Sequence, residues 1–286
     1  MAETATPLTA PIGLTRLGRP AAEAVAGLGP LANLVGTWMG SHGWELIAVP
    51  SGTPGEKESF QLIIRPYIEV VTFAELGAPV PDRGGPKGDI FLTGLHYSMR
   101  ITDAETNSPL HLENGMWLLL DGRGTVARQA SIPHGDVLLA IGGSSTAAGP
   151  PSIPVLNAIP EPGPDVQLGY TDPYGKPPTG FATDDANATL RTTVEGQTVV
   201  STTTLSVSTA NEGGGVLNIP FVQANANATK FACTYWIETV RDATGQEFAQ
   251  LQYSQQTDID FLPTFGGPPG SLIMWPHVNV NTLVKQ

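Results

Sequence analysis

The sequence predicts an all-β fold, an antiparallel up-and-down β-barrel of about ten strands with one long loop insertion. The chain of 286 residues has 33 glycines and 26 prolines, a composition that favours many short strands joined by turns. Several runs alternate apolar and polar side chains, for example residues 203–208, with the two-residue period of a half-exposed strand. No apolar pattern indicates a helix longer than three turns. A closed barrel is favoured because closure removes sheet edges and can leave an apolar cavity.

The expected elements begin with a glycine-flanked aromatic at residues 36–40, where Trp38 is expected to close the bottom of the barrel. Asn114-Gly115 indicates a bulge within its strand. A Gly/Pro-rich turn at 266–270 precedes the last strand. In chain order, the expected strands are 58–64, 67–73, 90–101, 110–120, 125–131, 137–141, 188–194, 197–207, 216–222, 229–240, 247–255 and 275–283.

The chain divides into an N-terminal arm, residues 1–29, and a single barrel domain, residues 30–286. The arm is rich in Ala, Gly and Pro and has weak periodicity. Within the domain, residues 143–185 hold repeated prolines and few alternating apolar positions. We interpret this block as a Pro/Gly-rich insertion rather than as a second domain.

Charge and cysteine content exclude several classes of function. The formal charge of −12 repels nucleic acid and anionic membrane surfaces. The single cysteine, Cys233, can form neither an internal disulfide nor a thiolate metal cluster, and we expect it to be buried in a strand. The N-terminus lacks a basic start followed by an apolar block, and no run approaches the ~20 apolar residues of a membrane span. A cytoplasmic protein is therefore expected.

Histidines are the residues that can carry chemistry, because the chain has no phosphate-binding glycine loop, zinc-protease motif or nucleophile elbow. His42 and His96 have no special context. His111 is expected to share a strand face with Glu113, as a satisfied polar pair or as part of a site. His134 lies in a turn, and His277 follows a proline, which favours a position near a barrel rim.

Three stretches resemble the nitrobindin family of haem-binding ten-stranded β-barrels, which are related to fatty-acid-binding proteins. The first is GTWMG at 36–40, the second is PLHLENGMW at 109–117, and the third is WPHVNVNTL at 275–283. Their order and approximate spacing agree with the family, and the similarity covers roughly residues 31–142 and 186–286. The insertion and the arm lengthen the chain beyond the compact form of the family.

The resemblance implies a haem b cofactor with His277 as the metal ligand. His111 is then expected on the distal side without binding the iron, and the function implied is nitric oxide binding or isomerisation of peroxynitrite to nitrate. In addition to the two histidines, three bulky side chains are expected to contact the porphyrin: Trp38, Met116 and Met274.

Two alternatives remain open at this point. His111 and His134 are the candidate catalytic residues, and a haem-dependent peroxidase or oxygenase acting on a small organic substrate would use His134 for acid–base chemistry. A haem-free carrier of a fatty acid or another hydrophobic ligand would pair a carboxylate with Arg65, Arg100 or Arg128.

Asn279 and Asn281 share a strand face with His277 and make that face more polar than a plain haem pocket. Homo-oligomerisation is left open.

Overall fold

A computed structural model describes residues 27–52, 59–77, 79–82, 90–120, 124–161, 169–264 and 266–286. The predicted arm therefore lies almost entirely outside the described residues. The strands are β1 (Gly36–Pro50), β2 (Phe60–Glu75), β3 (Val80–Asp82), β4 (Ile90–Asp103), β5 (Pro109–Leu119), β6 (Thr125–Ile132), β7 (Asp136–Ala148), β8 (Thr198–Ser208), β9 (Gly215–Asn218), β10 (Asn227–Arg241), β11 (Glu247–Pro263) and β12 (Leu272–Lys285). The helices are η2 (Gly29–Leu34), η5 (Asp172–Gly175), α2 (Ala188–Val194) and α3 (Pro220–Asn225).

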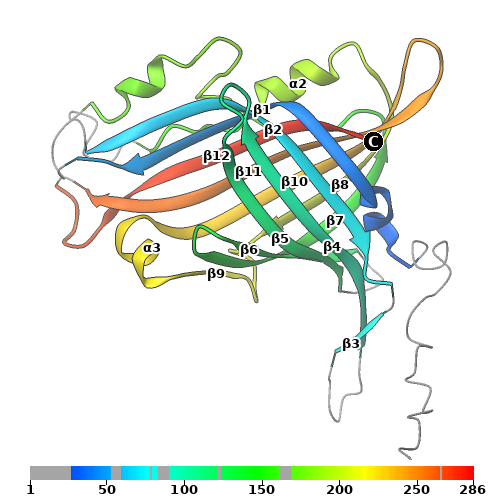
Figure 1. Ribbon diagram of the computed structural model, residues 1–286, viewed down its shortest axis with the longest axis horizontal. Coiled ribbons are helices and arrows are strands. Elements are labelled where there is room, and N and C mark those ends of the chain that lie inside the picture. The colour runs from blue at the N-terminus through cyan, green and yellow to red at the C-terminus, as the bar shows by residue number, and fades with distance from the viewer. Residues whose placement is uncertain are drawn as a thin grey trace, which may run out of the picture.

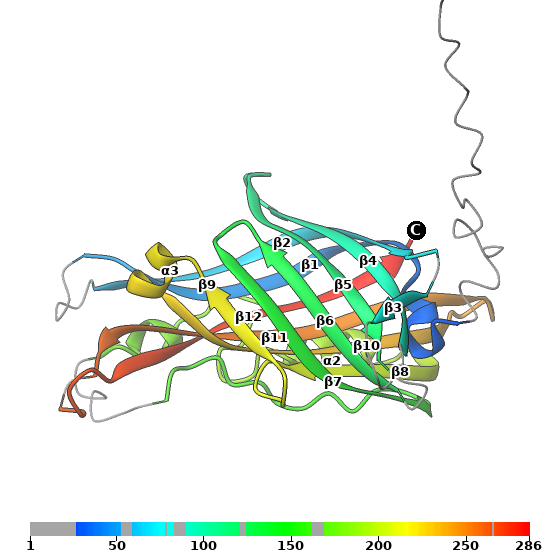
Figure 2. The same cartoon turned by 90° about the horizontal axis from the view of Figure 1, so that it is seen from below.

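Ten of these strands close into an antiparallel barrel, which confirms the predicted fold class (Figure 1). Each strand of the ring pairs with its neighbours in chain order, and the pairing of β1 with β12 joins the two ends of the chain. The pairing of β2 with β4 completes the ring. The short strands β3 and β9 lie outside it, on β4 and β7 respectively. Figure 2 shows β9 and α3 on the side of the barrel formed by β6 and β7.

Apolar side chains fill one end of the barrel. Trp38 is fully buried, and its Nε1 donates a hydrogen bond to the carbonyl oxygen of Leu34 at 2.7 Å, at the end of η2. Leu31 and Leu34 of the same short helix are also buried in this cluster. The glycine-flanked tryptophan and η2 thus pack together at this end of the barrel interior.

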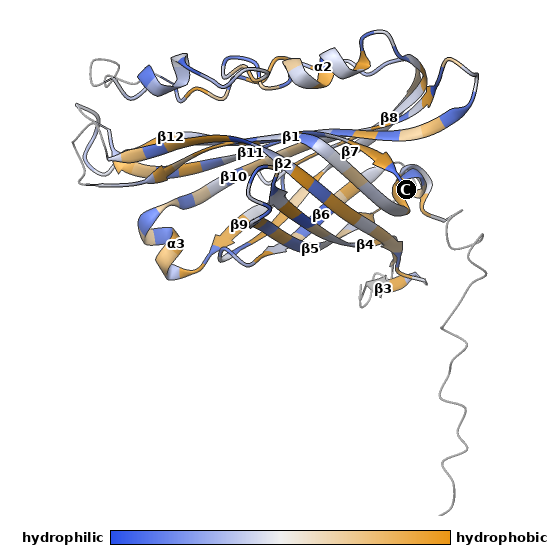
Figure 3. Ribbon diagram, turned by 45° about the horizontal axis from the view of Figure 1, so that its top comes forward, coloured by the Kyte–Doolittle hydropathy of each residue, from blue (hydrophilic) through white to orange (hydrophobic). Residues whose placement is uncertain are grey.

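The predicted insertion is an ordered strap against the outer wall. Strand β7 continues to Ala148, so regular pairing extends seven residues past the predicted end of the strand at Ile141. The strap, the described residues of 149–187, buries Ile153, Tyr174 and Phe181 in a second cluster with Leu46 and Val278 of the barrel. Figure 3 shows it running over the outside of β1, β11 and β12. It therefore covers an outer face of the sheet.

The predicted strand 188–194 is wrong and the predicted strand 216–222 is wrong in part, because helical spacing or proline decides the local structure. Residues 188–194 form α2, in which Leu190 and Val194, four residues apart, both pack into the strap cluster. The expected strand 216–222 ends as β9 at Asn218, and α3 begins at Pro220, a favoured first residue of a helix. None of the helices within the described ranges has the length and apolarity needed to cross a bilayer.

Candidate functional site

His277 lies on the inner side of β12, where its imidazole meets a carboxylate of the neighbouring strand β1. Its Nε2 lies 3.3 Å from Oε1 of Glu45, and its side chain is 20% exposed. The other oxygen of Glu45 accepts a hydrogen bond from Nε of Arg65 at 2.9 Å. Burial acts to raise the pKa of Glu45, but the hydrogen bonds and charges of His277 and Arg65 outweigh it and lower the pKa to about 2. Glu45 is therefore a carboxylate that orients the imidazole.

His111 and His134 lie close together on the same part of the barrel. Nε2 of His111, on β5, is 3.2 Å from Oε2 of Glu113, as the shared strand face predicted. The His111 ring lies 5.4 Å from the ring of His134, in the turn between β6 and β7. Burial, and then the nearby charge of His111, lower the pKa of His134, and His277 contributes in the same direction. The structure thus groups the three histidines that the sequence singled out, and we call this region the mouth.

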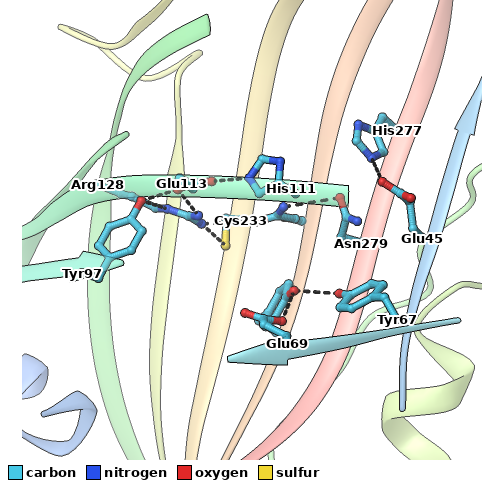
Figure 4. Close-up of polar contacts among 12 residues, drawn as sticks. Glu45, Tyr67, Glu69, Tyr97, His111, Glu113, Arg128, Cys233, His277 and Asn279 are labelled. Carbon is cyan, nitrogen blue, oxygen red and sulfur yellow. Dashed lines mark hydrogen bonds and ion pairs between the residues drawn. The ribbon is translucent and has the colours of Figure 1, made fainter. Parts of the chain in front are cut away.

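Beneath His111 lies a buried ion pair that the sequence did not predict. Nη2 of Arg128 donates to Oε1 of Glu113 at 2.7 Å, and neither side chain is more than 2% exposed. Tyr97 donates a short hydrogen bond to the same oxygen of Glu113 and accepts one from Nε of Arg128. Burial alone would raise the pKa of Glu113, but the charge of Arg128 and the contact with His111 lower it to about 2. This pair and its partners are shown in Figure 4.

Arg128 connects this pair to the strand that carries His277. Its Nη1 donates to Oε1 of Gln255 at 3.3 Å, and Nε2 of Gln255 donates to Oδ1 of Asn279 at 3.4 Å. The guanidinium also lies between 5.1 and 6.0 Å from the centres of four aromatic rings, those of Tyr97, Trp117, Phe231 and Tyr235. The polar face that Asn279 and Asn281 give to β12 is therefore used to anchor interior networks.

A second buried network surrounds Glu69 on β2. Its Oε2 accepts hydrogen bonds from the hydroxyl of Tyr253 at 2.7 Å and from Nδ2 of Asn281 at 3.0 Å. The Tyr253 hydroxyl is also 2.7 Å from the hydroxyl of Tyr67. Burial raises the pKa of Glu69 to about 7, despite these hydrogen bonds and the charges of Arg128 and His111. Oε1 of Glu69 has no partner within the described residues. Side chains therefore occupy the barrel interior around Glu69.

The raised pKa of Glu69 predicts how the stability of the protein depends on pH. Because its folded-state pKa of about 7 lies above the usual value of 4.5, folding takes up a proton between these values. The free energy of unfolding should therefore decrease as the pH rises from about 4.5 to about 7, by on the order of 3 kcal/mol from this group. Glu69→Gln should remove this pH-dependent contribution to the free energy of unfolding. The variant should therefore be more stable than the wild type at pH 8 and differ little from it at pH 4.5. Urea denaturation at both pH values measures the difference.

The control for this prediction is Glu75→Gln, which changes a partly exposed carboxylate at the end of the same strand. This control should follow the wild type at both pH values. A Glu69→Gln variant whose stability relative to the wild type is the same at pH 4.5 and pH 8 would contradict the prediction.

Three predicted cofactor contacts lie away from the mouth. Trp38 precedes Glu45 by seven residues on β1, roughly 20 Å along the strand, and belongs to the apolar end. Met116 is 41% exposed, because it alternates with the inward-facing Trp117. Met274 lies three residues from His277 on a regularly paired part of β12, and so on the opposite face. Proximity to a motif in the sequence did not show whether these side chains point toward the mouth, because that depends on strand register.

The donors at the mouth fit a haem iron. A porphyrin supplies four nitrogen ligands, so the protein needs to provide only one axial imidazole. His277 has one nitrogen oriented by a carboxylate, as is usual for metal-binding histidines, while its Nδ1 has no partner in the described part of the chain. Among the described residues, no group of three or more His, Cys, Asp or Glu side chains is arranged to hold a bare metal ion.

Sequence reasoning missed Glu45, Arg128 as a structural residue, and Glu69. The only signal for each was a charged residue within a strand-like run, which does not identify its partner. Glu45 and His277, for example, are 232 positions apart in the chain.

The comparisons with known proteins give a family match over part of the chain. Residues 27–150 match the family model described as the THAP4-like, heme-binding beta-barrel domain. A search of the curated proteins gave no match. Among solved structures, the crystal structure of Rv2717c from M. tuberculosis is 18% identical, with a TM-score of 0.46, and the match covers 94% of this chain and 99% of that one. The match of residues 27–150 to the THAP4-like, heme-binding beta-barrel domain confirms the nitrobindin-like resemblance that the motifs in this part of the chain predicted.

Proposed function

We propose that this protein binds haem b at the mouth, with His277 as the protein ligand of the iron. The observation that carries the proposal is the His277 imidazole, oriented by Glu45 and with one ring nitrogen unengaged among the described residues. The bound haem would supply a ligand-binding, redox-active iron. The chain would supply the imidazole that holds the iron, the carboxylate that orients it, and two further imidazoles, those of His111 and His134.

For the reaction we propose reversible binding of nitric oxide and isomerisation of peroxynitrite to nitrate. Both fit a site in which one imidazole would hold the iron and further polar side chains lie nearby. The isomerisation rearranges the atoms of one molecule and needs no second substrate. The haem-binding character of the family supports the cofactor, and the histidines of the mouth support the choice of small, polar ligands.

The arginines argue against a haem-free fatty-acid carrier. Arg128 is buried and already paired with Glu113, and Arg65 is paired with Glu45 and lies 3.7 Å from Asp103. Arg100 is exposed on the outside of β4. A fatty acid inside the barrel would therefore have to break an existing ion pair to find a cation, and it would compete for space with buried tyrosines such as Tyr67 and Tyr253.

Titration of the haem-free protein with haemin tests the proposal. We expect one haemin per chain and a Soret band typical of histidine ligation, followed by a spectral shift when nitric oxide is added. Glu45→Gln removes the orienting charge but retains the shape of the side chain, so haemin affinity should fall by about 10-fold or more. His42→Ala, an exposed histidine bonded only to Ser41 among the described residues, is the matched control and should bind like the wild type. A wild-type protein that takes up no haemin at saturation would end the proposal.

A further inference from the structure

Glu113 lies between donors on two sides. Its Oε1 accepts hydrogen bonds from Nη2 of Arg128 and from the hydroxyl of Tyr97. Its Oε2 faces Nε2 of His111 at 3.2 Å. Since an arginine side chain stays protonated in proteins, this fully buried partner keeps Glu113 ionised. The carboxylate can therefore only accept hydrogen bonds.

The charge on Glu113 decides where His111 carries its proton. A hydrogen bond from Nε2 to an ionised carboxylate requires a proton on Nε2. A neutral imidazole then has an unprotonated Nδ1, which is a hydrogen-bond acceptor. Nδ1 has no partner among the described residues, and it lies on the side of the ring away from Glu113 (Figure 4).

We propose that Glu113, held by Arg128, is a positioning residue that fixes His111 in the Nε2-protonated tautomer, so that Nδ1 acts as an acceptor toward the mouth. The assignment of this acceptor to a bound ligand depends on the proposed haem site, whereas the assignment of the tautomer does not. The mouth would then favour small ligands that carry an acidic proton, such as a hydroperoxide or peroxynitrous acid.

The acceptor also defines where such a proton goes. The O–H bond of the ligand breaks, its electron pair stays on the ligand oxygen, and the proton joins Nδ1 of His111. The imidazolium that results keeps its Nε2–H on Glu113, whose negative charge stabilises the new positive charge. Arg128 and Tyr97 keep Glu113 in place throughout.

Glu113→Gln tests the tautomer because an amide has one acceptor and one donor end. Arg128 and Tyr97 both donate to the Oε1 position, so the glutamine oxygen should take that place. Its NH2 group should then face His111 and donate to Nε2, which moves the ring proton to Nδ1. Nitrogen-15 NMR of the histidine rings in the haem-free protein at pH 7 distinguishes the two tautomers. We expect Nε2–H at His111 in the wild type and Nδ1–H in Glu113→Gln.

Glu69→Gln is the matched control, because it replaces another fully buried glutamate of the barrel interior, one that does not contact His111. It should leave His111 in the wild-type tautomer. An Nδ1–H tautomer in the wild type would overturn the proposal, as would a Glu113→Gln variant that folds and keeps Nε2–H. If Glu113→Gln does not fold, the wild-type spectrum alone decides the assignment.

A second readout tests the ligand-facing role in the haem-loaded ferrous protein. The stretching frequency of carbon monoxide should be lower in Glu113→Gln than in the wild type, because a donor replaces a lone pair beside the ligand. A tautomer change with an unchanged frequency would overturn this role of Nδ1. Failure to bind haemin would instead overturn the proposed function and leave the NMR result standing.

Discussion

Replacing His277 with alanine is expected to weaken haemin binding by more than about 100-fold, because loss of a second-shell partner alone costs about 10–100-fold. The variant would lose the only protein ligand proposed for the iron, and its Soret band should resemble that of free or non-specifically bound haemin. Added imidazole should restore part of the histidine-ligated spectrum by occupying the space of the missing ring. Absorption titrations with haemin, with and without imidazole, measure both effects.

The other two histidines of the mouth serve as internal comparisons for this result. His111→Ala and His134→Ala should retain the histidine-ligated spectrum, because neither is proposed to bind the iron. If His277→Ala binds haemin like the wild type and one of these two variants does not, the axial ligand has to be reassigned. Thermal unfolding of each haem-free variant separates a lost ligand from a lost fold.

Arg128→Met is expected to destabilise the protein by about 3–5 kcal/mol at pH 7, the usual effect of removing one partner from a buried ion pair. The guanidinium is fully buried and bonds to Glu113, Tyr97, Cys233 and Gln255, so its loss leaves the Glu113 charge without compensation. Urea denaturation at pH 7 measures the free energy of unfolding.

The pH dependence gives this second prediction a distinct signature. With Arg128 in place the pKa of Glu113 is about 2, so the stability that Glu113 contributes is lost only as the pH falls from about 4.5 toward 2. Without Arg128, burial should raise the pKa of Glu113 above its usual value, and the variant should recover stability relative to the wild type as the pH falls from 7 to 5.

Arg65→Met is the matched control for Arg128→Met. The Arg65 side chain is 33% exposed and pairs with Glu45, so the substitution should lower the free energy of unfolding by no more than about 1 kcal/mol. An Arg128→Met variant that loses as little as Arg65→Met would show that the buried network is not needed for stability.

Much of the fold and part of the site could be predicted from local patterns. Alternation, turn composition and the absence of long helical periodicity indicated a barrel, and motifs at 36–40, 109–117 and 275–283 indicated the family. The shared face of His111 and Glu113 followed from strand periodicity alone, since residues two apart lie on one side of a strand. The helix at 188–194 and the packing of the strap could not be predicted, because both depend on the outer wall against which Leu190 and Tyr174 are buried.

By itself, then, the sequence determined the kind of barrel, its family and three histidines worth attention, because these depend on residue type and near-neighbour spacing. Only the tertiary structure decided which side chains meet. Glu45 reaches His277 because β1 pairs with β12, and Arg128 reaches Glu113 because β5 pairs with β6. The physical reason is that strand register sets the face and neighbours of every side chain, and register is fixed by the closure of the whole barrel.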